Sequence, residues 1–229
     1  MKAMLTELRR WQDEGEEIAL ATLVRVQGSA PRRPGARLGV TRGGRVLGSV
    51  SGGCVENEVV EAARRVLDSG RPELTSYAIG DEPGSEAGLS CGGRIDVLTE
   101  RFREDESWRA VGSALEAHRP LVLCIGMAPA ALRGRRLVVD GEQTAGSIDA
   151  TLDAAIAARA RALCGGDEAR VEELPERGGG ASSPTPCSRS CGSRSPEEAA
   201  LAILAEMVAV LNRADARPLF AGRGPIHAS

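Results

Sequence analysis

The sequence predicts an α/β fold: a mixed sheet with hairpins and flanking helices, in one main domain that a flexible linker joins to a C-terminal helix. Short apolar runs bounded by glycine and proline, such as 18–26 and 121–126, are typical of buried strands. Segments with apolar residues every three or four positions, such as 55–67 and 195–211, are typical of helices that cover a sheet. Hydrophobic residues make up 42% of the 229 residues, which is enough for a core.

Composition divides the chain into four parts. Residues 1–176 hold most of the periodic segments and form the predicted main domain. Glycine, serine and proline dominate residues 177–195, so we expect a linker with little to bury. Residues 196–214 carry an apolar stripe at helical spacing behind a serine N-cap, which predicts the C-terminal helix. Residues 215–229 show little periodicity and are expected to be a tail.

The pattern predicts the order of elements in the main domain. We expect a short opening helix, strands at 18–26, 37–40 and 45–50, a helix at 55–67, strands at 73–79 and 94–100, a helix at 105–117, a strand at 121–126, a hairpin at 137–148, a helix at 152–163 and a strand at 170–174. Glycine-bearing turns at 41–44 and 140–141 fit tight hairpins. No internal repeat is visible in the sequence.

Charge and composition exclude several classes of function. The formal net charge is −3 and aromatic residues make up only 2%, so a nucleic-acid partner is not expected. No apolar run reaches the roughly 20 residues that a membrane span needs. The six cysteines are scattered and the start lacks a signal-peptide pattern, which predicts a cytoplasmic protein with reduced thiols. The usual motifs of nucleotide-binding enzymes, serine hydrolases and zinc peptidases are missing.

The stretch Gly48-Ser-Val-Ser-Gly-Gly-Cys-Val-Glu56 is the strongest candidate site. It places Cys54 just before a helix, where unpaired backbone N–H groups and the helix dipole favour a thiolate. Gly52 and Gly53 have no Cβ, so a ligand can approach the backbone closely. We expect an anion to meet a reactive sulfur on this stretch, with Ser51 beside it.

A second cysteine stands next to a glycine pair. Cys91 is followed by Gly92 and Gly93, at the point where a flexible loop enters a strand. Both cysteines could be small buried hydrophobic residues, as free cysteines often are. Core cysteines do not need flanking glycine pairs, so we favour one site shared by Cys54 and Cys91.

The loop from Gly28 to Arg37 carries three arginines between prolines and glycines. Arg32 and Arg33 could form a clamp for phosphate or carboxylate, or they could lie on a solvated surface loop. In the linker, Cys187 and Cys191 have a spacing that signals a metal site only weakly, and no histidine is near.

Three motifs together resemble the XdhC/CoxI family, whose members are accessory factors of molybdenum hydroxylases. The motifs are Gly28-Ser-Ala-Pro-Arg-Arg-Pro-Gly-Ala-Arg37, the Gly48–Glu56 stretch and Ser90-Cys-Gly-Gly93, in that order. The resemblance covers about residues 1–176 and resumes at 193–206, which looks like the C-terminal helix of the family.

The resemblance implies a function and a site. It implies binding of the molybdenum cofactor (molybdopterin), support for its sulfuration, and delivery to an apo-hydroxylase such as xanthine dehydrogenase or carbon monoxide dehydrogenase. A cysteine desulfurase is a further candidate partner, and we expect a homo-oligomer. The implied cofactor site consists of Cys54, Cys91, Ser51, Gly52, Gly53, Gly92, Gly93, Arg32 and Arg33. The two cysteines would lie near molybdenum at most.

The chain departs from the family in one respect. Full-length members resemble a two-domain protein with a Rossmann-like domain before the C-terminal helix, and here the linker at 177–195 stands in its place. NAD binding is therefore not expected. We favour a non-catalytic carrier over two alternatives: an enzyme that uses Cys54 for thiol or sulfur-transfer chemistry, and a degenerate module that binds only the partner hydroxylase.

Overall fold

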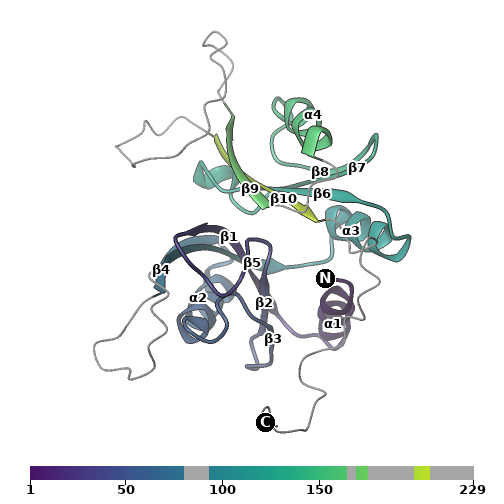
Figure 1. The fold of residues 1–229 in the computed structure, drawn as a ribbon. Helices are drawn as coiled ribbons and strands as arrows, with labels where there is room; N and C mark the ends of the chain where they lie inside the picture. The colour runs from purple at the N-terminus through teal and green to yellow at the C-terminus, as the bar shows by residue number, and fades with distance from the viewer. Residues whose placement is uncertain (80–92, 164–168, 175–198, 207–229) are drawn as a thin grey trace, which may run out of the picture.

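The computed structural model describes residues 1–79, 93–163, 169–174 and 199–206 (Figure 1). The elements in chain order are α1 (Lys2–Asp13), β1 (Ile18–Gln27), β2 (Arg37–Thr41), β3 (Val46–Gly48), α2 (Glu56–Ser69), β4 (Glu73–Ile79), β5 (Gly93–Phe102), α3 (Glu106–Glu116), β6 (Leu121–Gly126), η1 (Ala130–Leu132), β7 (Arg136–Asp140), β8 (Gln143–Ser147), α4 (Asp153–Leu163), β9 (Ala169–Leu174) and β10 (Ala199–Glu206). The expected α/β class with hairpins and flanking helices is confirmed.

The strands form two sheets where we expected one mixed sheet. The first sheet has the order β3-β2-β1-β5-β4, and the second has the order β8-β7-β6-β10-β9. Every pairing among the described strands is antiparallel, which corrects the expected mixture of directions. Neighbouring strands run in opposite directions throughout, so neither sheet needs the crossover connection that parallel strands require.

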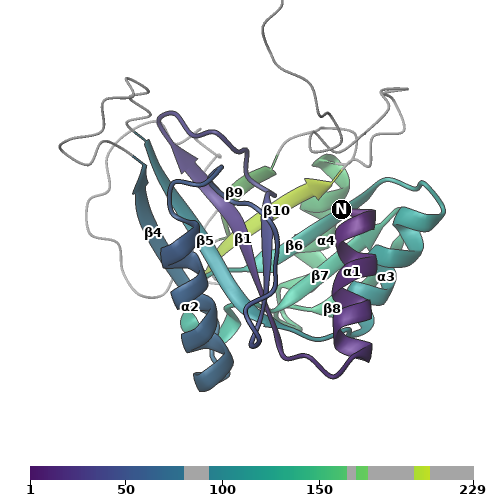
Figure 2. The same ribbon diagram turned by 90° about the horizontal axis from the view of Figure 1, so that it is seen from below.

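The two sheets lie one above the other and share a core between their inner faces (Figure 1). Helix α2 packs on the outer face of the first sheet, and α4 packs on the outer face of the second. Helices α1 and α3 lie side by side and bury their apolar faces in the core between the sheets (Figure 2). Each sheet is therefore covered on both faces, as its nearly continuous apolar strands require.

Helix α2 illustrates how the sequence fixes an element. Its inward face carries Val59, Ala62, Ala63, Val66 and Leu67, each at most 1% exposed. This three-and-four spacing buries one stripe of the helix against the first sheet. The helix ends where a glycine adopts the left-handed conformation, which suits the residue after a helix. No helix in the described ranges is long and apolar enough to cross a bilayer.

The structure reveals an internal repeat that the sequence does not display. The first repeat, residues 2–102, runs α1-β1-β2-β3-α2-β4-β5, and the second repeat, residues 106–206, runs α3-β6-β7-β8-α4-β9-β10. The strands correspond in chain order, and each strand has the same position in its sheet as its counterpart: β1 and β6, for example, are both central. The described elements of the two halves are thus built on one plan, and each helix or strand of one half can be compared with its counterpart in the other.

A pair of glycines fixes the match between the repeats. Gly48 and Gly146 each face the second residue of the preceding strand in the hairpin. Their φ angles are +88° and +81°, and an added Cβ would stand 2.3 Å from the Arg37 carbonyl oxygen and 2.5 Å from that of Arg136. Both positions therefore require glycine, because the backbone has a positive φ and a Cβ would collide with the neighbouring strand. Arg37 and Arg136 are counterparts as well.

Residues 199–206 correct one prediction. They form strand β10 between β6 and β9, where we expected part of a helix over 196–214. The apolar residues of this segment fit a central strand as well as a helical stripe, and pairing on both sides satisfies the backbone of a strand. The predicted linker at 177–195 and the predicted tail at 215–229 lie outside the described residues.

Candidate functional site

The loop between β3 and α2 is folded around one carboxylate. Glu56, the first residue of α2, accepts hydrogen bonds from the Ser49 hydroxyl at 2.6 Å and from the backbone N–H groups of Ser51 at 3.0 Å, Gly52 at 3.1 Å and Gly53 at 2.7 Å. The Ser51 hydroxyl also donates to it. The loop therefore encloses its own anion, in a backbone arrangement that elsewhere binds phosphate.

These hydrogen bonds change the acidity of Glu56. Partial burial alone would raise the pKa of this carboxyl group, but the hydrogen bonds from Ser49, Ser51 and Gly53 outweigh burial and lower the pKa to about 2. Each bond favours the charged form, since a carboxylate accepts hydrogen bonds more strongly than a carboxylic acid. Glu56 is thus a fixed negative charge at the start of α2.

The internal carboxylate corrects one expectation about the site. We expected the N–H groups around Gly52 and Gly53 to receive the anion of a ligand, but Glu56 already occupies them. A carboxylate on the same chain, a few residues away, has a higher effective concentration than any ligand in solution. The loop therefore serves to hold the Cys54 backbone in place, and a ligand anion must bind elsewhere.

The thiol of Cys54 is exposed, as a reactive sulfur requires. It lies two residues before α2, as the sequence predicts, between Gly53 and the buried Val55. Gly53 has a φ of +114°, and a Cβ at this position would meet nothing within 4 Å. Bare backbone therefore faces open space next to the sulfur.

Three segments far apart in the sequence meet at this site. A Cβ on Gly52 would lie 3.3 Å from the Cβ of Pro31, so the cysteine loop touches the arginine loop. A Cβ on Gly93, at the start of β5, would lie 2.0 Å from the carbonyl oxygen of Ser29. Gly93 therefore needs to be glycine because the arginine loop packs directly on it. Cys91 and Gly92 lie outside the described residues.

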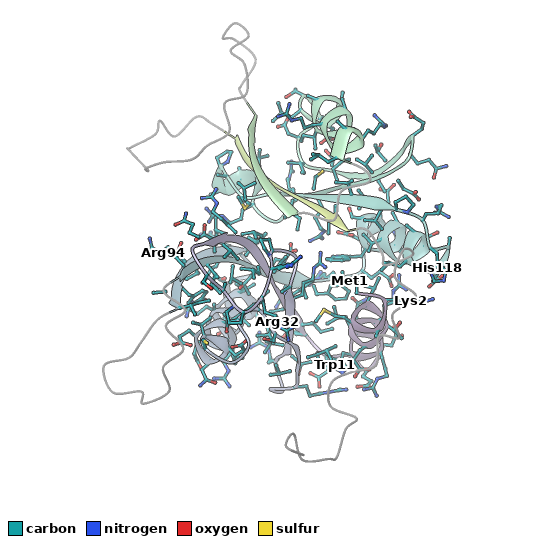
Figure 3. The ribbon with its side chains drawn as sticks, viewed as in Figure 1. Met1, Lys2, Trp11, Arg32, Arg94 and His118 are labelled. Atoms are coloured by element: carbon teal, nitrogen blue, oxygen red, sulfur yellow. The ribbon has the colours of Figure 1, made fainter. Side chains whose placement is uncertain are left out.

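The arginine loop also borders a hollow of about 250 Å³. The lining includes Met1, Met4, Arg32, Gly35, Arg37 and Ser49. Figure 3 labels two residues of this lining, Met1 at the start of α1 and Arg32 on the arginine loop. Ser49 belongs to both features, because its hydroxyl is a partner of Glu56. The hollow and the cysteine loop are thus two parts of one surface.

The two arginines of the predicted clamp differ in position. Both side chains are exposed. Arg32 lines the hollow, and Arg33 is not part of its lining. Arg37, which opens β2, is 5% exposed and donates a hydrogen bond to the Met1 sulfur at 3.1 Å. The positive charge at the hollow therefore comes from Arg32 and Arg37.

The sequence-based reasoning missed several residues of this surface. Glu56 was expected only as the end of a motif, although an acidic residue at a helix start is favoured by the helix dipole. Met4 lies on the short opening helix that the sequence predicts, but the pattern gives no sign that it also lines the hollow. Across the residues with described placement, no group of three or more histidine, cysteine and acidic side chains could hold a metal ion. Cys187 and Cys191 fall outside those residues.

Comparison with known proteins gives a consistent result. Residues 11–78, which hold the arginine loop and the cysteine loop, match the model of the XdhC and CoxI family. The chain is 37% identical over 109 residues to the molybdenum cofactor insertion chaperone PaoD of Escherichia coli K12. The matched region covers 48% of this chain and 34% of PaoD. It is 35% identical over 96 residues to a probable xanthine dehydrogenase subunit of Bacillus subtilis 168, covering 41% of this chain and 29% of that protein.

A solved structure shares the fold. A crystal structure described as a xanthine dehydrogenase from Bacillus halodurans superposes with a TM-score of 0.50 at 22% sequence identity, over 62% of this chain and 44% of the other. At this identity the likeness shows the fold alone. The chain matches about a third or less of the length of the curated relatives, so their activities do not transfer to it as a whole.

Proposed function

We propose that this chain, which belongs to the XdhC and CoxI family, binds the molybdenum cofactor and serves as its insertion chaperone for a molybdenum hydroxylase in the cytoplasm. The family match over residues 11–78 and the name of the relative PaoD support the cofactor. The name of the relative from Bacillus subtilis supports a hydroxylase of the xanthine dehydrogenase type as the partner.

One observation carries the proposal. The exposed thiol of Cys54 stands on a loop that Glu56 holds rigid, and this loop touches the arginine loop through Gly52 and Pro31. A chaperone must hold a reactive ligand without consuming it, and a preorganised surface reduces the entropy lost on binding. A rigid, accessible sulfur beside arginines meets this need.

The residues present fit the chemical groups of the cofactor. Its phosphate suits Arg32, because guanidinium groups form strong charge-assisted hydrogen bonds with phosphate. Its flat pterin can approach the bare backbone at Gly53, where a Cβ would meet nothing within 4 Å. Its metal centre suits the soft sulfur of Cys54. When bound, the cofactor supplies the molybdenum chemistry of the recipient hydroxylase.

Cys91 completes the proposed site. It precedes Gly93 by two residues in the sequence, as the second cysteine with a glycine pair. Gly93, the first described residue after Cys91, packs against the arginine loop at Ser29. We propose that the two sulfurs protect the cofactor during sulfuration, with a cysteine desulfurase as sulfur donor, and that a homo-oligomer then delivers it to the apo-hydroxylase.

The test measures how much cofactor the purified chain retains after gel filtration. Cys54→Ala and Cys91→Ala should each lose most of the retained cofactor. Cys124→Ala is the matched control, because Cys124 is buried on β6 in the second sheet. Equal retention in the wild type and all three variants would remove the site assignment. Equal retention together with binding of the apo-hydroxylase would instead favour a module that binds only the partner.

A further inference from the structure

Each of the two sheets ends in edge strands, whose backbone pairs on one side only. The first sheet ends at β3 and β4, and the second sheet ends at β8 and β9. An edge strand leaves a row of N–H and C=O groups that can pair with another chain, and natural proteins protect such edges with charged side chains or by keeping the strand very short. The four edges of this protein can therefore be compared for their protection.

Three of the four edges are protected in this way. Strand β3 is only three residues long, and Arg45 stands directly before it. Strand β4 begins with Glu73, which forms an ion pair with Arg65 of α2 at 2.9 Å. Strand β9 has the sequence Ala-Arg-Val-Glu-Glu-Leu, in which three of six residues are charged. Addition of a further strand at these edges would have to accommodate short length or charge.

Strand β8 has neither protection. It runs Gln-Thr-Ala-Gly-Ser over residues 143–147, without charge or proline, and every residue except the central Ala145 is exposed. Its pairing with β7 is regular over all five residues. Within the described part of the chain, no strand pairs with the other side of β8. A regular, uncharged edge of this kind favours the addition of a strand from another chain.

The sequence of β8 is compatible with a second copy of itself. In an antiparallel pair centred on Ala145, Gln143 would face Ser147 of the second copy and Thr144 would face Gly146 of the second copy. Like charges directly opposite each other destabilise a strand pair, and this pair contains none. Both copies would contribute the same residues, as the interface of a two-fold dimer requires.

We propose that β8 is the surface through which two copies of this chain associate, by antiparallel pairing of their β8 strands about a two-fold axis at Ala145. The two five-stranded second sheets would then join into one continuous sheet. The inference deepens the proposed function and rests on it for the homo-oligomer that delivers the cofactor. The surface is separate from the candidate cofactor site, because Cys54 precedes α2, and α2 packs on the outer face of the first sheet.

The first experiment measures the mass of the full chain, without cofactor, by light scattering after gel filtration. Two five-residue strands bury little surface, and interfaces below about 1,200 Å² are typical of transient contacts. The mass should therefore rise from that of a monomer towards that of a dimer as the protein concentration increases from micromolar towards millimolar. A wild type that stays monomeric over this whole range would overturn the proposal.

Charged variants of β8 test the pairing directly. Thr144→Lys and Thr144→Glu would each bring like charges of the two copies together as diagonal neighbours, about 7–8 Å apart, so each variant alone should lose the dimer. An equal mixture of the two should form dimers again, because the charges are then opposite, and this recovery shows that both variants fold. Ala78→Lys changes an exposed residue on the edge strand β4 of the first sheet and should associate like the wild type. Dimers of Thr144→Lys alone, or a mixture that stays monomeric, would contradict the pairing of β8 with itself.

The two proposals fail separately, because cofactor retention and mass are measured independently. If the Thr144 variants behave as expected but cofactor retention does not depend on Cys54, the β8 surface stands and the cofactor assignment falls. If Cys54→Ala loses the cofactor but the wild type is monomeric, the cofactor assignment stands and the β8 surface falls.

Discussion

The two repeats of this molecule have the same strand order and the same internal caps, yet they differ at one surface. In both, the first residue of the covering helix closes the preceding loop: Glu56 accepts N–H groups in the first repeat, and Asp153 accepts those of Ile148 at 2.9 Å and Asp149 at 3.1 Å in the second. The carboxylate cap is therefore a structural device that belongs to the fold.

The differences between the repeats show where function lies. The first repeat carries the Gly-Gly-Cys sequence ending at Cys54 and an open hollow beside Arg32. In the second repeat, Arg136 pairs with Glu100, which lies on β5 of the first repeat, and with Asp105, which precedes α3. The loop before α2 thus exposes a thiol, whereas the matching loop before α4, residues 148–152, has no cysteine. The following predictions challenge this contrast, from the largest expected effect to the smallest.

Removing the arginine of the second repeat should have the largest effect on stability. Arg136→Ala leaves the buried Glu100 without its partner, and burial already raises the pKa of Glu100 despite the arginine beside it. We expect a loss of about 3 kcal/mol or more in the free energy of unfolding, as for other broken buried pairs. Urea titration measures it, with Arg71→Ala as the exposed control. A loss similar to that of the control would mean that the Arg136–Glu100 pair, which joins the two repeats, does not stabilise the fold.

Removing the charge of the loop cap should have an intermediate effect. Glu56→Gln keeps the shape but weakens hydrogen bonds from Ser49, Ser51 and the two glycines. Because the carboxylate is only partly buried, we expect a loss of about 1–2 kcal/mol in the free energy of unfolding. Asp153→Asn, the matched change in the second repeat, should cost less, since Asp153 accepts fewer bonds from its loop. A larger cost at Asp153 would reverse the comparison.

The same carboxylate predicts a dependence on pH. The pKa of Glu56 is about 2 in the folded chain against an ordinary value of 4.5, so the folded form binds its proton less readily than the unfolded form. Its contribution to stability is complete above about pH 4.5 and is lost as the pH falls towards 2. Unfolding free energies from pH 6 to pH 2 should therefore fall less steeply in Glu56→Gln than in the wild type. Parallel curves would show that Glu56 does not titrate in this way.

The cysteine should have the smallest effect on stability. Cys54→Ser changes an exposed side chain that makes no described contact in the core, so the free energy of unfolding should stay within about 0.5 kcal/mol. Thermal unfolding measures this. A clear loss would indicate that Cys54 supports the fold, and its proposed role in binding would then need separate proof.

The sequence predicts the elements of this fold better than their assembly. The periodicity of α2 and the apolar run of β1 identify both elements with nearly their observed bounds, because local burial patterns determine them. The pairing of β10 between β6 and β9 was not predictable, since the apolar run at 199–206 fits either a helix or a strand. The internal repeat is also not visible in the sequence, because residues in corresponding places differ in type. Met4 lies next to Gly48 in the first repeat, for example, and Ser107 lies next to Gly146 in the second.

The candidate site was predictable in its parts and not in its chemistry. The glycines around Cys54 predict backbone that a ligand can approach closely, and the thiol of Cys54 is exposed. The role of Glu56 depends on side-chain geometry that spacing alone does not reveal. The hollow beside Arg32 likewise arises from the meeting of α1 with the arginine loop, which only the tertiary fold brings together.

The most direct test compares matched loops of the two repeats for retention of the molybdenum cofactor. Cys54→Ala changes the loop before α2, and Thr151→Ala changes the corresponding loop before α4. Binding in the first repeat predicts that Cys54→Ala loses most of the cofactor per chain after gel filtration, while Thr151→Ala retains as much as the wild type. Equal retention by both variants would contradict the assignment of the cofactor to the first repeat.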